Sequence, residues 1–265
     1  MEQETALISS LAVVHPDAQI GIGVQIDAFA TVEPNTVIGD YTHIHQGAII
    51  KSGSRIGQHC QVHPYAVVGN IPQDLKFKGE ETTAVIGNHT TLREFVTINR
   101  GTASRNTTRV GDNCLIMAYC HVAHDCVLGN SLIIGNGTQI AGEVEIDDFS
   151  TISGGVLIHQ FVRISQHVMI QGGSRVGKDI PPYTLIGREP ISYCGINSVG
   201  LRRRGFQNEQ IFLINDIYRL LYQSGMNKTE VLKEIEKNYA DCYERNLILD
   251  FIKNSERGIV RGSME

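Results

Sequence analysis

The most regular feature of the sequence is an aliphatic residue that recurs every six positions. From Ile8 the step of six reaches Val68 without exception, and it resumes after each of two interruptions, the last run ending at Val176. All 26 of these positions hold Ile, Val or Leu, and both interruptions are whole multiples of six long. A period of six cannot keep an apolar stripe on one face of a 3.6-residue helix, so each hexad is predicted to be one short strand and one turn.

The residue two places before each aliphatic position is patterned as well. It is Ala, Val, Thr, Ser or Cys in 25 of 26 hexads, with Leu132 as the exception. Residues two apart in an extended segment point to the same side, so the large and the small residue are predicted to share one interior. Glycine follows the aliphatic residue in nine hexads. We expect a positive φ at these corners, for which glycine is suited.

This [Leu/Ile/Val]-Gly-x4 repeat resembles the left-handed parallel β-helix, in which three hexads form one 18-residue triangular coil. The resemblance predicts that coils stack about 4.8 Å apart and that residues 18 apart are vertical neighbours. The predicted β-helix covers residues 1–187, with loops at the two interruptions, about 70–83 and 99–108.

The composition changes after the hexads stop, and residues 188–265 are predicted to form a C-terminal helical domain. Apolar residues at helical spacing follow Asn208, a possible N-cap, and Gly225 is expected to end that helix. Asn227 with Glu230 resembles a capping box at the start of a second helix. A third helix is predicted within "YERNLILDFIKNS".

Composition narrows the classes of protein. The net charge of −5 and the pI near 6.1 lack the basic excess of a non-specific nucleic-acid binder, so small molecules or proteins are the expected partners. No apolar run approaches the roughly 18 residues of a membrane span, and the acidic start "MEQETALISS" is unlike a signal peptide. The six cysteines show no spacing typical of a disulfide framework. We therefore expect a cytoplasmic protein.

The stretch "CHVAHDC" places two cysteines and two histidines within seven residues. Cys120 and Cys126 occupy the small inward position of their hexads, whereas His121 points outward and His124 lies at the following turn. Cysteines inside and histidines outside cannot converge on one ion at the roughly 2.0–2.3 Å that zinc requires. No metal site is predicted.

Polar groups gather along one outer edge near this stretch. Gly142 follows His124 by 18 residues and Gln160 follows it by 36, so the stacking rule predicts a vertical column of the three. Glu143 and His159 flank that column. A cluster of titratable groups on the outside of a solenoid indicates a functional site.

The motifs "QDLKFKGE", "REFVTINRGT", "HVAHDC", "HQF", "KDIPPY" and "GLRRRGF", in this order on a hexapeptide scaffold, resemble the UDP-N-acetylglucosamine O-acyltransferases that begin lipid A biosynthesis. The resemblance covers nearly the whole chain. It implies a homotrimer that transfers an (R)-3-hydroxyacyl chain from acyl carrier protein to the 3-hydroxyl of UDP-N-acetylglucosamine. It implies no cofactor of the enzyme itself, because the 4′-phosphopantetheine arrives on the carrier protein.

The resemblance also implies roles for individual residues. His124 matches the general base, Asp125 the residue that orients its imidazole, and the Gly142 amide the oxyanion donor. Gly172 falls where the family measures acyl length, beside Met169 and Gln171, and its missing side chain predicts a long donor, about fourteen carbons or more. Substrate-binding roles are implied for Gln73, Asp74, Lys76, His121, Glu143, His159, Gln160, Asn197, Arg203 and Arg204.

The sequence departs from the usual family pattern at three positions. Asn99 and Glu143 stand where histidines are usual, and Val199 replaces a glutamate near the uracil. These departures leave the nucleotide contacts and the acceptor open, including a 3-amino variant of the sugar.

Two other enzyme classes remain as alternatives. One is a sugar acetyltransferase that uses acetyl-coenzyme A. The other is a zinc lyase of the γ-carbonic-anhydrase type with His121, His124 and His159 as ligands, although the His-x2-His spacing does not match that family.

Overall fold

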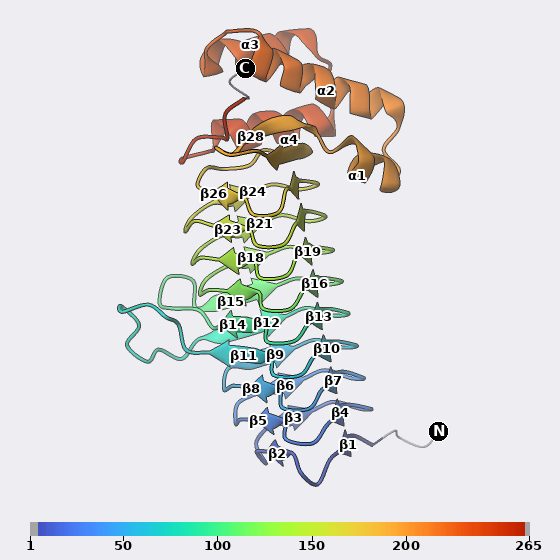
Figure 1. Cartoon of the computed structure of the whole chain (residues 1–265), viewed down its shortest axis with the longest axis vertical. Helices are drawn as coiled ribbons and strands as arrows, with labels where there is room; N and C mark the ends of the chain where they lie inside the picture. Colours follow the sequence, from blue (N-terminus) through green and yellow to red (C-terminus); the bar gives the residue numbers. More distant parts are fainter. Residues whose placement is uncertain (1–4, 263–265) are drawn as a thin grey trace.

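The computed structural model describes residues 5–262 of the chain. These residues form a tall left-handed parallel β-helix with α-helices at one end, which confirms the predicted fold class (Figure 1). Each coil contributes one short strand to each of three sheets, here named faces A, B and C in the order in which the chain visits them. All strand pairs in these sheets are parallel except the last pair of face A. The result is a triangular prism whose long axis runs across the strands.

The strands are mostly two residues long. Face A contains β1 (Leu7–Ile8), β4 (Gln25–Ile26), β7 (His43–Ile44), β10 (Gln61–Val62), β13 (Thr91–Leu92), β16 (Leu115–Ile116), β19 (Ile133–Ile134), β22 (Thr151–Ile152), β25 (Met169–Ile170), β27 (Thr184–Gly187) and β28 (Ser192–Ile196). Face B contains β2 (Val13–Val14), β5 (Thr31–Val32), β8 (Ile49–Ile50), β11 (Val67–Asn70), β14 (Thr97–Asn99), β17 (His121–Val122), β20 (Gln139–Ile140), β23 (Leu157–Ile158) and β26 (Arg175–Val176). Face C contains β3 (Gln19–Ile20), β6 (Val37–Ile38), β9 (Ser54–Ile56), β12 (Thr83–Ile86), β15 (Thr107–Val110), β18 (Val127–Leu128), β21 (Glu145–Ile146) and β24 (Arg163–Ile164).

Strand pairing sets residues of successive coils above one another. In regular coils the paired residues are 18 apart, as Ile26 and Ile44 are on face A. The loops lengthen this separation locally, so that Val62 pairs with Leu92. Every aliphatic position of the hexads from Ile26 to Val176 is buried. Burial of this continuous apolar column is the main driving force for the prism.

The glycines that follow the aliphatic residues serve a different purpose from the one expected. Of the nine, only Gly69 has a positive φ. The left-handed residue comes two places later and is usually not glycine, as at Tyr41 with φ 57°. At Gly39 an added Cβ would lie 2.7 Å from the carbonyl carbon of Gly57 in the next coil. The expectation of positive φ was therefore wrong at eight of the nine positions. At seven of these eight the backbones of adjacent coils approach too closely for a Cβ, and only at Gly177 does an added Cβ meet nothing within 4 Å.

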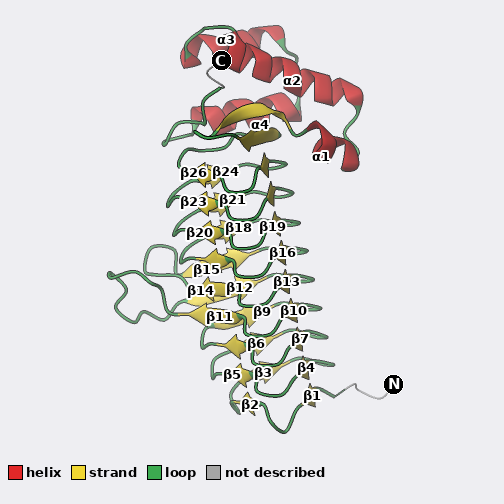
Figure 2. Ribbon diagram, viewed as in Figure 1, coloured by secondary structure: helices red, strands yellow, loops and turns green. Residues whose placement is uncertain are grey.

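The helices lie together at the C-terminal end of the prism (Figure 2). Their bounds are α1 (Ser198–Arg203), α2 (Asn208–Gln223), α3 (Lys228–Asn238) and α4 (Tyr243–Lys253). The sequence pattern indicated α2, α3 and α4 but not the short α1.

Local contacts fix where two of these helices begin. We expected Asn208 to be the N-cap of α2, but it is the first residue of the helix. The N-cap is Gln207, whose N–H donates to Gln210 Oε1 at 2.9 Å. The predicted capping box of α3 is confirmed, because the Glu230 N–H donates to Asn227 Oδ1 at 3.0 Å and the Asn227 N–H donates to Glu230 Oε2 at 3.2 Å.

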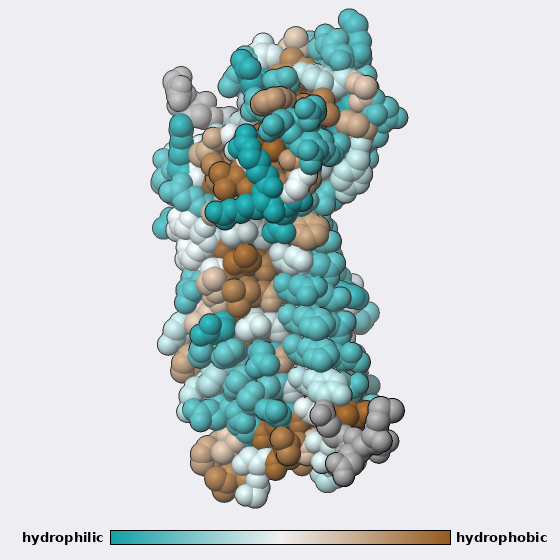
Figure 3. All heavy atoms as spheres, turned by 90° about the vertical axis from the view of Figure 1, so that its right-hand side faces the viewer, coloured by the Kyte–Doolittle hydropathy of each residue, from teal (hydrophilic) through white to brown (hydrophobic). Residues whose placement is uncertain are grey.

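The surface repeats from coil to coil as the interior does. Figure 3 shows similarly coloured side chains above one another, with hydrophilic rows beside a hydrophobic patch. Within residues 5–262, no helix has the length and apolar character needed to cross a membrane. All six cysteines are free thiols, and burial raises the pKa of Cys120 to about 11 and that of Cys126 to about 12.

Candidate active site

The two loops and the "CHVAHDC" stretch meet at the corner between faces B and C. The first loop leaves face B after β11 and rejoins face C at β12, and the second connects β14 to β15 in the same way. His124 and Asp125 form the turn between β17 and β18, on the next coil. Both loops project from the same side of the prism (Figure 1). This corner therefore combines regular turns with inserted segments.

The centre of the corner is a contact between His124 and Asp125. His124 Nδ1 lies 2.8 Å from Asp125 Oδ2. Asp125 has a φ of 59°, in the left-handed region, which aspartate tolerates better than most residues and which turns its side chain back beside the preceding imidazole. Its carboxyl group is fully buried, and His124 is only 8% exposed. The inserted loops thus cover an imidazole that the hexad pattern alone would leave on the outside.

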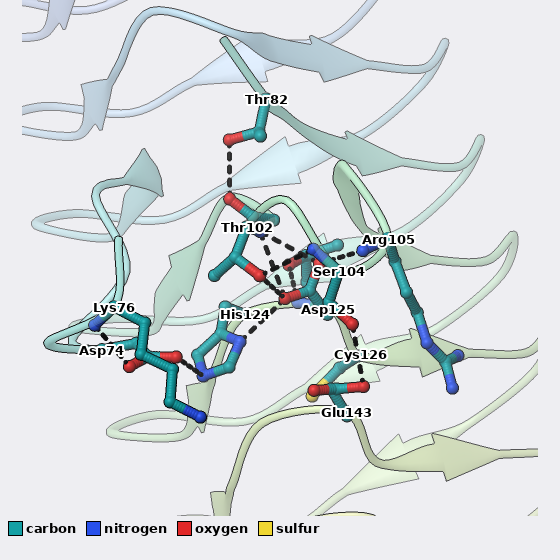
Figure 4. A network of polar contacts seen from close by, with 12 residues as sticks. Asp74, Lys76, Thr82, Thr102, Ser104, Arg105, His124, Asp125, Cys126 and Glu143 are labelled. Atoms are coloured by element: carbon teal, nitrogen blue, oxygen red, sulfur yellow. Dashed lines mark hydrogen bonds and ion pairs between the residues drawn. The ribbon is translucent and has the colours of Figure 1, made fainter. Parts of the chain in front are cut away.

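The second loop holds the carboxyl group in place (Figure 4). Thr102 donates to it from its N–H, at 3.0 and 3.1 Å to the two oxygens, and from Oγ1 at 2.6 Å. The Arg105 N–H donates to Oδ1 at 3.1 Å. An acceptor surrounded by donors in this way behaves as an ionised carboxylate, which only accepts hydrogen bonds. The hydrogen on His124 must therefore be on Nδ1, which leaves the Nε2 lone pair facing the outside of the corner.

The side of His124 that carries Nε2 faces Gly142 and the first loop. A Cβ added to Gly142 would lie 2.6 Å from both Cε1 and Nε2 of His124, so the glycine backbone lies directly against the imidazole. No residue within 5–262 accepts a hydrogen bond from the Gly142 N–H. Asp74 Oδ2, from the first loop, lies 3.8 Å from Nε2 (Figure 4). The glycine that packs against Nε2 of His124 thus has a backbone N–H without an acceptor among the described residues.

A groove of about 400 Å³ runs from this corner along face B. Gln73, His121, His124, Gly142 and Gln160 all line it, so the structure brings these five predicted site residues together. The vertical column predicted from the 18-residue spacing is confirmed. Lys76 lies beside this group on the first loop, where its N–H donates to Asp74 Oδ1 at 2.9 Å.

Two further groups on the groove wall are polar. His121 Nδ1 lies 2.7 Å from Thr97 Oγ1, and burial together with the nearby His124 lowers the pKa of His121, which keeps it neutral near pH 7. Asn99 also lines the groove, and its Nδ2 is buried without a hydrogen-bond partner within the described residues. A buried amide donor without a partner is costly unless a ligand or water satisfies it.

Two residues that we expected to flank the column face away from the groove. Glu143 Oε2 accepts from Ser104 Oγ at 3.1 Å and lines a separate cavity of about 410 Å³. His159 Nδ1 lies 3.3 Å from a guanidinium nitrogen of Arg257 and does not line the groove. Within the described part of one chain, His121, His124 and His159 therefore do not bring their ring nitrogens together around one point.

Three of the predicted substrate-binding residues lie at a different corner of the same chain. Asn197 caps α1, where its Oδ1 accepts from the Gly200 N–H at 3.1 Å, and Arg203 is exposed at the end of that helix. The Arg204 guanidinium lies 4.7 Å from the ring centroid of Phe149. Phe149 follows β21 and precedes β22, so this group lies at the corner between faces C and A. Within one chain it does not meet His124.

The predicted acyl-length residues lie at the third corner, between faces A and B. Met169 is in β25, and Gln171 and Gly172 follow it. The latter two line a cavity of about 230 Å³. A Cβ added to Gly172 would lie 3.1 Å from Gly154 O, which leaves this position narrow but accessible. Leu157, on face B, lines the groove between the catalytic corner and this one.

The sequence pattern did not reveal the residues that support Asp125. Thr102 and Arg105 belong to the second loop, to which we had assigned bounds but no catalytic role. Thr108 accepts the Asp125 N–H on its Oγ1 at 2.8 Å. These contacts depend on how a non-repeating loop folds back across the corner, and the hexad register carries no information on that path.

The hexapeptide β-helix and its match to a family model first define a class, the hexapeptide-repeat transferases. The family model described as bacterial transferase hexapeptide (six repeats) matches residues 17–52 and 107–142. A second family model, UDP-N-acetylglucosamine O-acyltransferase domain 2, matches residues 179–260. The first model thus matches two parts of the prism, and the second matches the C-terminal end with its helices.

Individual relatives narrow the class to a family. The chain is 44% identical over 195 residues to the acyl-[acyl-carrier-protein]–UDP-N-acetylglucosamine O-acyltransferase of Ectopseudomonas mendocina, covering 73% of this chain and 76% of that protein. The structure of the UDP-N-acetylglucosamine acyltransferase from Bacteroides fragilis matches with 53% identity and a TM-score of 0.93, covering 96% of this chain and all of the other. That from Francisella novicida gives 37% identity and a TM-score of 0.94, with 97% and 95% covered. The chain belongs to the UDP-N-acetylglucosamine O-acyltransferase family.

Proposed function

We propose that this chain transfers an (R)-3-hydroxyacyl group from acyl carrier protein to the 3-hydroxyl of UDP-N-acetylglucosamine, the first step of lipid A biosynthesis. His124 Nε2 takes the proton of the sugar hydroxyl as that oxygen attacks the thioester carbonyl carbon. A C–O bond forms, the C–S bond breaks, and the imidazolium returns the proton to the leaving thiolate. The products are the ester and the free thiol of the carrier protein, and no covalent acyl-enzyme is formed.

The observation that carries this mechanism is the joint placement of His124, Asp125 and Gly142. The buried Asp125 carboxylate fixes the tautomer in which Nε2 is the base, and proton transfer to a positioned base typically contributes about 10²- to 10⁴-fold. The Gly142 backbone lies against the same imidazole, and its N–H has no acceptor among residues 5–262, so it can donate to the oxyanion that forms on the thioester carbonyl. Such a donor is worth about 10²- to 10³-fold.

The polar residues around the groove support a nucleotide-sugar acceptor. Asp74, 3.8 Å from Nε2, and Lys76 on the same loop are suited to hold sugar hydroxyls next to the base. His121 and Gln160 extend the polar wall on neighbouring coils. The unpaired Nδ2 of Asn99 offers the acceptor one further donor, at a position where the family usually has histidine.

The separation of the predicted binding residues supports a homotrimer. Asn197 and Arg204 lie at the corner between faces C and A, whereas His124 lies at the corner between faces B and C. One nucleotide-sugar can contact both groups only if they come from adjoining subunits. We therefore place each active site between two copies of the chain, as the family resemblance implies.

The donor side of the proposal rests on the basic cluster of α1 and on the groove along face B. Arg202, Arg203 and Arg204 lie together on a chain of net charge −5. Of the three, Arg203 suits the phosphate of 4′-phosphopantetheine or an acidic carrier protein. The acyl chain would lie along face B past Leu157 towards Gly172. With an acyl carrier protein as donor, the proposed location of the enzyme is the cytoplasm.

A donor competition experiment tests the proposal. The purified chain is supplied with UDP-N-acetylglucosamine, a series of (R)-3-hydroxyacyl carrier proteins and acetyl-coenzyme A, and the acylated nucleotide is identified by mass spectrometry. We expect ester formation from the long hydroxyacyl donors and none from acetyl-coenzyme A. Preferential use of acetyl-coenzyme A would establish the alternative acetyltransferase function.

A further inference from the structure

A group of histidines lies far from the active site, near the N-terminal end of the prism. Asp27 and His45 occupy equivalent corner positions between faces A and B, one coil apart, and His43 lies on β7 of the same coil as His45. The ring centroids of His43 and His45 are 3.8 Å apart, and His63, one coil further on, stacks on His45 at 4.6 Å. All of these lie well before the interruptions that build the catalytic corner.

The ligating atoms of three of these residues face one another. Asp27 Oδ2 lies 3.0 Å from His43 Nε2 and 3.6 Å from His45 Nδ1, and the three ligand atoms all lie within 4.8 Å of one another. A tetrahedral zinc ion with bonds of about 2.0–2.1 Å places neighbouring ligand atoms roughly 3.3 Å apart. The two distances to Asp27 lie on either side of that value.

The contact between Asp27 and His43 is not a hydrogen bond. His43 Nε2 is buried and has no hydrogen-bond partner within the described residues, although a carboxylate oxygen lies 3.0 Å away. A nitrogen and an oxygen this close, but not directed at each other, are the arrangement expected of two ligands directed at one ion. A simple ion pair would be expected to align the N–H with the oxygen.

The tautomer of His45 is set by a separate contact. His45 Nε2 lies 2.9 Å from Gln61 Oε1, which can only accept, so Nε2 carries the hydrogen and Nδ1 presents its lone pair towards Asp27. Metal-binding histidines typically donate their other ring nitrogen to an oxygen in this way. The side chains of Asp27, His43 and His45 are each partly exposed, so the group lies at the surface of the prism even though His43 Nε2 itself is buried.

We propose that Asp27, His43 and His45 form a binding site for a divalent cation of the zinc class. Two neutral imidazoles and one carboxylate are ligands that suit such ions, with water in the remaining position. The ion would connect two successive coils at the less buried end of the prism, where Leu7 is 65% and Val13 is 67% exposed. The site is independent of the acyl-transfer function.

Calorimetric titration of the untagged, metal-free full-length chain with ZnCl₂ tests this proposal. We expect one tight site per chain, and a dissociation constant at least about tenfold higher in Asp27→Asn and in the double variant His43→Gln/His45→Gln. Asp27→Asn is nearly isosteric, so loss of the fold does not explain its effect. The matched control is His63→Gln, which removes a ring stacked on His45 but no ligand, and its affinity should equal that of the wild type.

Substitution with Co²⁺ gives an independent readout, because visible absorption of the bound ion reports tetrahedral nitrogen and oxygen ligands. We expect this absorption in the wild type and in His124→Gln, and its loss in Asp27→Asn. Equal zinc affinity in the wild type and the His43→Gln/His45→Gln variant would overturn the proposal. So would loss of binding in His124→Gln, because the ion would then be bound at the catalytic corner.

Discussion

Replacement of Gly142 by alanine tests the geometry of the active site with one added methyl group. The new Cβ would lie 2.6 Å from Cε1 and from Nε2 of His124, whereas ordinary contacts begin at 3.4 Å. Either the imidazole or the backbone of the turn must therefore move by about 1 Å. Gly142 does not have a positive φ, so the substitution adds no backbone strain of its own.

The expected effect is large on catalysis and small on folding. A misplacement of about 1 Å in a catalytic group costs about 10²-fold in rate, which corresponds to about 2.7 kcal/mol of transition-state free energy. The free energy of unfolding should change by no more than about 1 kcal/mol, because alanine also restricts the unfolded chain. Activity and stability should therefore respond differently.

The assay is steady-state acyl transfer to UDP-N-acetylglucosamine, with thermal unfolding measured on the same preparations. Gly177→Ala is the matched control: an added Cβ there meets nothing within 4 Å, and φ is again not positive, so this variant should retain wild-type activity. If Gly142→Ala stays within about threefold of the wild type in kcat/KM, the Gly142 backbone does not define the position of the base.

Three further predictions concern the acyl groove, the subunit contact and the thiols. Gly172→Met should shift donor preference to shorter acyl chains by filling the groove, and an unchanged chain-length profile in a donor series would contradict the assigned role. Co-expression of His124→Ala with Arg204→Ala should restore part of the activity that each homo-oligomer lacks, because a mixed trimer contains some sites in which both residues are intact. If confirmed mixed trimers show no recovery, the two residues of one active site come from the same subunit. Burial raises the thiol pKa of Cys120 to about 11 and that of Cys126 to about 12, so these groups stay protonated near pH 7. In the native state, a thiol reagent should therefore modify only the exposed Cys194 and the partly exposed Cys242. Rapid reaction of all six cysteines before unfolding would show that the core is open.

The sequence predicts the prism well because a position in the six-residue repeat corresponds directly to a position on the coil. A residue and the one 18 places later are vertical neighbours, so the adjacency of His124 and Gly142 follows from counting alone. The small inward position likewise predicts that Cys120 and Cys126 are buried. These inferences need no knowledge of side-chain packing, since every coil repeats the same backbone path.

The remaining features depend on parts of the chain that do not repeat. The loop that carries Thr102 folds back over Asp125, and no periodic pattern specifies where its N–H groups point. The group formed by Asp27, His43 and His45 was also missed, because it joins a corner position with a strand position on the next coil. Both sets of contacts depend on the directions of particular side chains and N–H groups, which the repeat does not specify.

The most direct test of the central claim is the rate of acyl transfer by His124→Ala, measured with a long (R)-3-hydroxyacyl carrier protein and UDP-N-acetylglucosamine. If His124 Nε2 removes the proton of the attacking hydroxyl, kcat should fall by about 10²- to 10⁴-fold in a protein that unfolds at nearly the wild-type temperature. Transfer at the wild-type rate would show that another group is the base.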